Sequence, residues 1–209
     1  MRARRRFRGR IAGVGSSSGV RVVVGWWLES PFGAFADAMV ETADGHRVLL
    51  APTDEVAELV STTYTFDEVR LEPVEVHAGW ADGDAWVRSW GSSSPSLSLT
   101  LDVGERTGLG RLLRVVPPAL ATSPAFATLA DPVARVALRG VRTRGVARAG
   151  RREYYGATDV RAVTGMTGRF DGVDLGALAP VDPPCRFGFS STPRRPSVTE
   201  VTTTIVDTA

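Results

Sequence analysis

Polar and apolar residues alternate along much of this chain with the two-residue period of β-strands. The clearest case is 96–103, where every second residue is leucine or valine and the residues between them are polar. Residues 19–28 form an almost unbroken apolar run, which predicts a strand buried on both faces. The same reasoning predicts strands over 36–43, 46–51, 68–79, 85–90, 142–149, 151–162, 163–170, 185–190 and 197–206. Asp44-Gly45 and Asp171-Gly172 predict tight turns of the kind that joins two antiparallel strands.

Two regions change to the helical period. Residues 53–61 predict a short helix, because Thr53 can cap it and Val56, Leu59 and Val60 share one face. A helical insert is predicted near 105–140, where leucines and valines recur three and four positions apart and "SPAFATLA" and "DPVARVAL" each place a proline at the first position of a short helix.

These elements predict a mainly β protein, with about nine to eleven strands and the helical insert in the middle. We expect a single-domain antiparallel β-barrel, with a two-sheet sandwich as the alternative, because closure removes the edges of so many strands. The domain is assigned to 11–209. Residues 1–10 contain six arginines and no acid, and are predicted to be a flexible basic tail. No apolar run reaches the length of a membrane span, so none is expected.

Composition excludes some chemistry. All 25 basic residues are arginine, so no lysine can form a Schiff base and no Walker A phosphate loop is present. The single cysteine, Cys185, cannot form an intramolecular disulfide, which favours the cytoplasm. We expect no cofactor, and nothing in the composition indicates an oligomeric state.

Candidates for catalysis or metal binding are few. "GSSSG" around Ser17 matches a hydrolase pattern, but a strand follows it rather than a helix, so a loop is the better interpretation. The spacing of His46, His77 and Cys185 matches no known metal site, and no metal is expected. Asp37, Glu41 and His46 could meet across the predicted hairpin as acid and base.

Tryptophan is the better guide to a ligand site. Trp86, Arg88 and Trp90 are predicted to share one strand face, with Trp26 and Trp27 behind them. Aromatic walls around one charge suit a small apolar or amphipathic molecule, which could carry an anionic group. Packing between sheets uses the same residues and remains the alternative.

Arginine-rich segments allow a third function, the binding of nucleic acid or another polyanion. Besides the first ten residues, the stretch 139–155 carries arginines beside two tyrosines, a mixture that can bind single strands by ion pairing and stacking. The alternative is a solvated strand face. The arginines and tyrosines concerned are Arg139, Arg142, Arg144, Arg148, Arg151, Arg152, Tyr154 and Tyr155.

The segment "SPFGAFADAMVE", residues 30–41, resembles the small-residue turn and acidic strand of the acetoacetate decarboxylase family. That resemblance implies a cone-shaped β-barrel, with Gly33 and Phe35 at the turn and Asp37 or Glu41 near the cavity mouth. The family's imine-forming lysine has no counterpart here, so the resemblance implies a scaffold without that chemistry. More widely, segments such as "GRREYYGATD" and "RFGFSSTPRRPSV" resemble a group of uncharacterised actinobacterial proteins, which implies no activity.

Three hypotheses follow. The first is non-catalytic binding of a small apolar or amphipathic ligand in a barrel cavity, through Trp26, Trp27, Trp86, Arg88 and Trp90. The second is a lysine-independent acid–base enzyme using Asp37, Glu41 and His46, and the third is polyanion binding.

Overall fold

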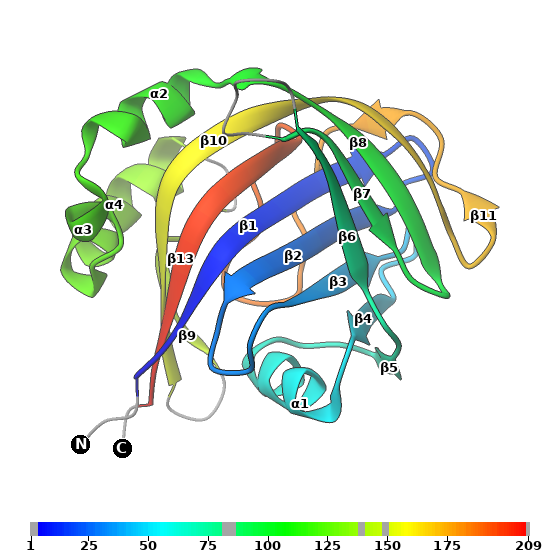
Figure 1. Cartoon of the computed structure of the whole chain (residues 1–209), viewed down its shortest axis with the longest axis horizontal. Helices are drawn as coiled ribbons and strands as arrows, with labels where there is room; N and C mark the ends of the chain where they lie inside the picture. Colours follow the sequence, from blue (N-terminus) through cyan, green and yellow to red (C-terminus); the bar gives the residue numbers. More distant parts are fainter. Residues whose placement is uncertain (1–3, 81–86, 138–140, 148–150, 208–209) are drawn as a thin grey trace.

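The computed structural model describes residues 4–80, 87–137, 141–147 and 151–207. One strongly curled sheet makes up most of this part of the chain, and helices flank it (Figure 1). The prediction of a mainly β, barrel-like fold is confirmed. The strands are β1 (Arg4–Ser16), β2 (Arg21–Glu29), β3 (Phe35–Glu41), β4 (Arg47–Ala51), β5 (Glu68–Leu71), β6 (Glu75–Trp80), β7 (Val87–Ser93), β8 (Leu97–Arg106), β9 (Arg144–Ala147), β10 (Arg151–Phe170), β11 (Val173–Asp174), β12 (Leu178–Ala179) and β13 (Ser197–Asp207).

The main path of the sheet runs β5-β4-β3-β2-β1-β13-β10-β8-β7-β6. Its neighbours are antiparallel except for the parallel pair β4–β5. The first and last strands lie side by side near its centre, with Arg4 opposite Val206 and Gly13 opposite Ser197 (Figure 1). The prediction of a flexible tail over 1–10 is therefore wrong from Arg4 onward, because these residues are paired in strand β1.

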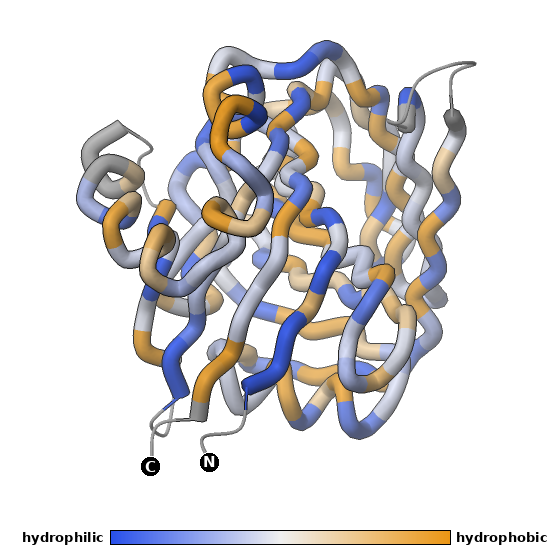
Figure 2. The backbone as a smooth tube through the Cα atoms, turned by 60° about the vertical axis from the view of Figure 1, so that its left-hand side comes forward, coloured by the Kyte–Doolittle hydropathy of each residue, from blue (hydrophilic) through white to orange (hydrophobic). Residues whose placement is uncertain are grey.

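Strands β8, β7 and β6 curl back over β1 to β4, as Figure 1 shows, and form a half-barrel. Its interior holds the largest apolar core, to which strands such as β2, β3 and β8 contribute every second residue. Valines 22 and 24 of β2 meet the leucines of β8 there, and apolar and polar residues alternate along the strands in Figure 2. β10 spans 20 residues and changes register at three places, which lets it bend around the barrel.

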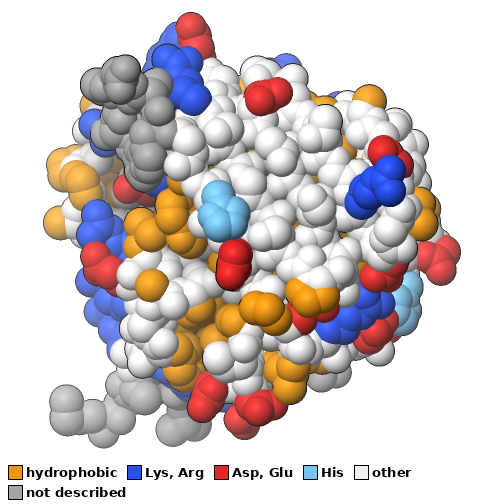
Figure 3. Space-filling model, turned by 45° about the vertical axis from the view of Figure 1, so that its right-hand side comes forward, with side chains coloured by type: hydrophobic (Ala, Val, Ile, Leu, Met, Phe, Trp, Pro, Cys, Tyr) orange, Lys and Arg blue, Asp and Glu red, His pale blue; other side chains and the backbone are white. Residues whose placement is uncertain are grey.

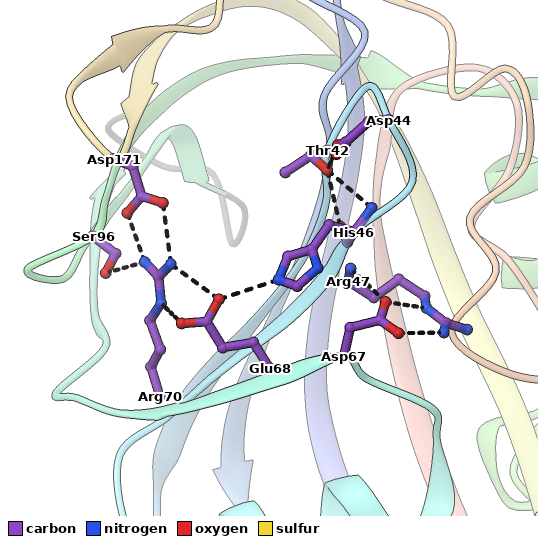
Figure 4. Close-up of polar contacts among 9 residues, drawn as sticks. All are labelled: Thr42, Asp44, His46, Arg47, Asp67, Glu68, Arg70, Ser96 and Asp171. Atoms are coloured by element: carbon purple, nitrogen blue, oxygen red, sulfur yellow. Dashed lines mark hydrogen bonds and ion pairs between the residues drawn. The ribbon is translucent and has the colours of Figure 1, made fainter.

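A polar cluster links the edge strand β5 to the opposite wall of the half-barrel (Figure 4). Arg70 on β5 donates to Asp171 in the β10–β11 turn at 2.6 and 3.1 Å, and to Ser96 beside β8 at 2.9 Å. It also pairs with Glu68 at 2.7 Å. Side chains therefore connect β5 to the opposite wall where strand pairing does not, so the edge of the sheet is partly covered.

The helices are α1 (Asp54–Thr63), α2 (Gly108–Val115), α3 (Pro118–Ala121) and α4 (Pro124–Ala137). The predicted helix at 53–61 is confirmed, and Thr53 caps it by accepting a bond from the backbone N–H of Val56. The helical insert is confirmed too, although its last two predicted helices are one: α4 continues through Pro132. No helix in the described part of the chain is long and apolar enough to cross a membrane.

The two predicted tight turns differ in backbone conformation. Asp171 and Gly172 both have positive φ, 49° and 77°, as the predicted turn type requires. At the β3–β4 hairpin only Gly45 does, at 92°. There the hydroxyl of Thr42 accepts the backbone N–H of His46, so a side chain completes a wider turn.

Candidate functional site

A cavity of about 640 Å³ lies on the face of the sheet opposite to the half-barrel core. Strands β1, β2, β3, β10 and β13 form its floor, and α1, α2, α4 and the segment 187–193 cover it. Such a volume is typical of pockets for small molecules. Most of its lining is apolar, with contributions from Phe7, Ile11, Val23, Trp27, Phe35, Met39, Leu59, Val60, Leu109, Leu112, Leu113, Val116, Phe126, Leu129, Val160, Phe187, Val201 and Ile205.

Strand periodicity decides which residues reach the cavity. In β2, Val22 and Val24 face the half-barrel core, whereas Val23, Gly25 and Trp27 face the cavity. The prediction that 19–28 is buried on both faces is thus explained by two apolar compartments, one on each side of the sheet.

Asp37 on β3 places a carboxyl group in this apolar wall. The residue is only 3% exposed, and the indole Nε1 of Trp27 donates to its Oδ1 at 2.8 Å. Gly25 lies opposite Asp37 on β2, and a Cβ there would come within 2.5 Å of that oxygen and 2.7 Å of the indole nitrogen. Burial raises the pKa of Asp37 to about 7, although the bond from Trp27 opposes the shift.

Glu153 on β10 is the second buried carboxyl group of the cavity. It is 2% exposed and accepts bonds from two tyrosine hydroxyls: Tyr64 at 3.0 and 3.2 Å, and Tyr155 at 3.1 Å. The two hydroxyls also contact each other. Burial raises the pKa of Glu153 to about 7, and burial together with the nearby carboxyl raises the pKa values of both tyrosines.

The one basic side chain that lines the cavity in the described part of the chain is already neutralised. This side chain is Arg142, and its guanidinium pairs with Asp131, with its Nε at 3.1 and 3.2 Å from the two carboxylate oxygens. No described basic side chain pairs with Asp37 or Glu153. The hydroxyl of Thr203, on the cavity floor, is buried and has no hydrogen-bond partner among the described residues.

Among the predicted ligand-binding residues that the structure describes, Trp27 alone lines the cavity. Trp26 points to the opposite face and packs edge-on against Trp90, with 5.5 Å between ring centroids. Trp90 is completely buried in the half-barrel core. Arg88 is exposed, and Trp86 lies outside the described residues. The core-packing alternative therefore holds for Trp26 and Trp90, and the two described residues of the predicted wall, Arg88 and Trp90, do not line the cavity.

Asp37, Glu41 and His46 do not meet either. Glu41 is buried but forms ion pairs with Arg21 and Arg186, each at 3.0 Å, so its charge is already neutralised. His46 lies at the hairpin turn, exposed, 3.2 Å from Glu68 (Figure 4). Of the predicted trio, only Asp37 lines the cavity.

The remaining candidates for catalysis or metal binding lie on the surface, in a turn or in the core. Both histidines lie on the surface, apart from each other (Figure 3). Ser17 lies in the turn after β1, where its hydroxyl accepts the backbone N–H of Ala177. Burial and the charge of Glu41 raise the pKa of Cys185 to about 11, which disfavours the thiolate. Within the described residues, no group of three or more His, Cys, Asp or Glu could hold a metal ion.

Glu153 and Tyr64 were not among the residues predicted from the sequence, and Tyr155 was predicted only as part of a basic segment. The strand period separates the residues of that segment: Glu153 and Tyr155 face the cavity, whereas Arg152 does not. An acid on the apolar face of a predicted strand was the available signal. No local pattern indicated Tyr64, because its partners are about ninety positions away along the chain.

The fold and the cavity have no counterpart in the comparisons with known proteins. No family model, curated protein or solved structure matches the chain.

Proposed function

We propose that the protein binds a small apolar or amphipathic molecule in the cavity between the sheet and helices α1, α2 and α4, without converting it. The cavity of about 640 Å³ is the observation that carries the proposal. Apolar walls provide binding energy, while a few buried polar groups determine orientation, as in most small-molecule sites.

The helical insert provides a route of entry. Leu112 on α2 and Leu129 on α4 line the cavity, yet they are 66% and 74% exposed. Side chains that contact both the cavity and the solvent mark where the cavity opens. Loosely packed helices at the entrance would allow it to widen for a ligand.

Filling the cavity tests this function. Ala157 lines it from β10, so Ala157→Trp should obstruct it, whereas Thr100→Trp places the same ring on an exposed position of β8. We expect Nile red to bind the wild type and Thr100→Trp equally, and Ala157→Trp at least about tenfold more weakly, a loss of about 1.4 kcal/mol. Absence of binding to the wild type, or equal binding to all three, would contradict the proposal.

Acid–base catalysis on the bound molecule is the second candidate. Two carboxyl groups with pKa values near 7 share the cavity, and such values suit a general acid or base at neutral pH. These residues are Asp37 and Glu153 rather than Asp37, Glu41 and His46. Mass spectrometry of ligands recovered after incubation tests it: a change in the wild type that Glu153→Gln or Asp37→Asn abolishes would favour the enzyme over the binding protein.

Two other proposals have less support. An anionic ligand group was inferred from Arg88, which does not line the cavity. Polyanion binding relied partly on a free basic tail, and Arg4 to Arg10 instead form part of strand β1, where Arg8 pairs with Glu29 at 3.0 Å.

A further inference from the structure

We propose that the ligand carries a positively charged nitrogen, an ammonium or a guanidinium group, that pairs with Asp37. The inference rests on the proposed function, since it names the chemical class of the molecule that the cavity binds. Three observations support it: the incomplete bonding of Asp37, the charge balance of the cavity, and the buried hydroxyl of Thr203.

Asp37 has room for a further partner. Trp27 is the only side chain among the described residues that bonds to it, and it bonds to Oδ1. A carboxylate can accept about four hydrogen bonds, and an ionised one buried in apolar surroundings requires them. Glu153 differs, because two tyrosine hydroxyls already donate to its oxygens. Asp37 is therefore the carboxyl group that a ligand would complete.

Charge balance indicates the sign of that ligand group. Among the described residues, two carboxyl groups and one arginine line the cavity, and that arginine, Arg142, is paired with Asp131. A cationic nitrogen would neutralise Asp37 in a low-dielectric site, where such a pair is strong when both groups are hydrogen-bonded. A carboxylate ligand would meet like charge, and a neutral ligand would leave an ionised Asp37 without a counter-charge.

Thr203 independently indicates that a polar group enters the cavity. Its residue is 3% exposed, it lines the floor, and its hydroxyl has no partner among the described residues. A buried hydroxyl without a partner is costly, so a ligand N–H or hydroxyl would be favourable there. In the sheet, β13 with Thr203 is the neighbour of β10, which carries Glu153. Strands β1 and β2 separate β13 from β3, which carries Asp37.

Aromatic rings provide the surface for the rest of the molecule. Trp27, which holds Asp37, lies in contact with Phe7 and Phe35, with ring centroids 5.9 and 6.5 Å apart. Such rings bind an apolar body, and their faces also attract a cation. The site thus suits a hydrophobic amine better than a fatty acid or an alcohol of the same length.

Three ten-carbon probes that differ only in their polar terminal group test the inference: decylamine, decanol and decanoic acid. Isothermal titration calorimetry at pH 7.5 should give decylamine an affinity at least about tenfold above that of decanol, as expected for a charge-assisted hydrogen bond, with decanoic acid weakest. In Asp37→Asn the amine and the alcohol should bind within about threefold of each other. Glu153→Gln removes the other carboxyl group of the cavity and shows which of the two pairs with the amine. Asp174→Asn, at an exposed position outside the cavity, is the matched control and should keep the amine preference.

The wild type provides a second measurement that needs no variant. Decylamine stays protonated from pH 5 to pH 8, whereas Asp37, with its pKa of about 7, ionises in this range. The preference for the amine over the alcohol should therefore rise by about tenfold or more between these pH values.

The outcomes separate the two proposals. Equal binding of amine and alcohol, or a preference that persists in Asp37→Asn and does not change with pH, would overturn the cationic ligand and leave the binding function intact. Loss of the preference in Glu153→Gln alone would also overturn the assignment to Asp37. If none of the three probes binds, the binding function itself fails.

Discussion

Replacing Asp37 with asparagine should change how the stability of the protein depends on pH. Burial raises the pKa of this carboxyl group from 3.8 to about 7 in the folded protein. As the pH rises above about 4, the unfolded chain loses the proton first, so the unfolded state becomes favoured. Stability is thus highest below pH 4, decreases up to about pH 7 and is constant above it, as far as Asp37 is concerned.

The size of this effect follows from the shift. About three pKa units, at 1.36 kcal/mol each, correspond to about 4 kcal/mol of unfolding free energy between pH 4 and pH 8. Glu153 acts in the same direction, because its pKa rises from 4.5 to about 7, which corresponds to about 3 kcal/mol. Asparagine cannot ionise, but its carbonyl oxygen can still accept the bond from Trp27.

Urea denaturation at several pH values between 4 and 8 measures the effect. We expect the stability of Asp37→Asn relative to the wild type to rise by about 4 kcal/mol from pH 4 to pH 8. Asp174→Asn, at an exposed position, is the control and should follow the wild type. Parallel curves for Asp37→Asn and the wild type would refute the reasoning, because Asp37 would then titrate as a solvated group and the cavity wall around it would not be dry.

Three further predictions concern single side chains. Gly25→Ala should lower stability by about 1–3 kcal/mol in thermal denaturation, because the new methyl group would overlap the contact between Asp37 and Trp27; an unchanged melting temperature would contradict this. Arg70→Met should cost about 1–2 kcal/mol in urea denaturation through loss of the bonds to Asp171 and Ser96. An unaltered midpoint would mean that the polar cluster does not stabilise the contact between β5 and the opposite wall. Trp90→Phe should lose the buried bond to Ser92 and lower the unfolding free energy by about 1–2 kcal/mol without weakening Nile red binding. Trp27→Phe, which loses the bond to Asp37, should weaken Nile red binding. The opposite result would mean that the ligand occupies the half-barrel instead.

Local patterns predicted most of the strands and helices, because strand and helix periods depend on near neighbours. The strand at 96–103 and the capped helix after Thr53 are examples. Pro132 was misjudged because a proline removes one helical bond, a loss that the rest of a long helix can tolerate. Residues 4–10 were misjudged because arginines on a strand can extend into solvent while their backbone pairs with distant β13.

The site was less predictable, because it depends on which side of the sheet holds a cavity. Both faces of β2 are apolar, so nothing local distinguishes Trp26, which packs in the core, from Trp27, which lines the cavity. Asp37 was a candidate, but its neighbours were wrongly assigned, since His46 belongs to the turn. Glu153 meets Tyr64 through a tertiary contact that no spacing along the chain reveals.

The position of β13 between β1 and β10 has a consequence for biosynthesis. The strands β1 to β5 and the later strands β6 to β8 with β10 are joined mainly by this strand, which follows all of them along the chain. Until it has emerged from the ribosome, the nascent chain carries two open sheet edges, along β1 and β10, which can pair with other chains. We therefore expect the sheet to be completed only once β13 has emerged, with chaperones protecting the intermediate.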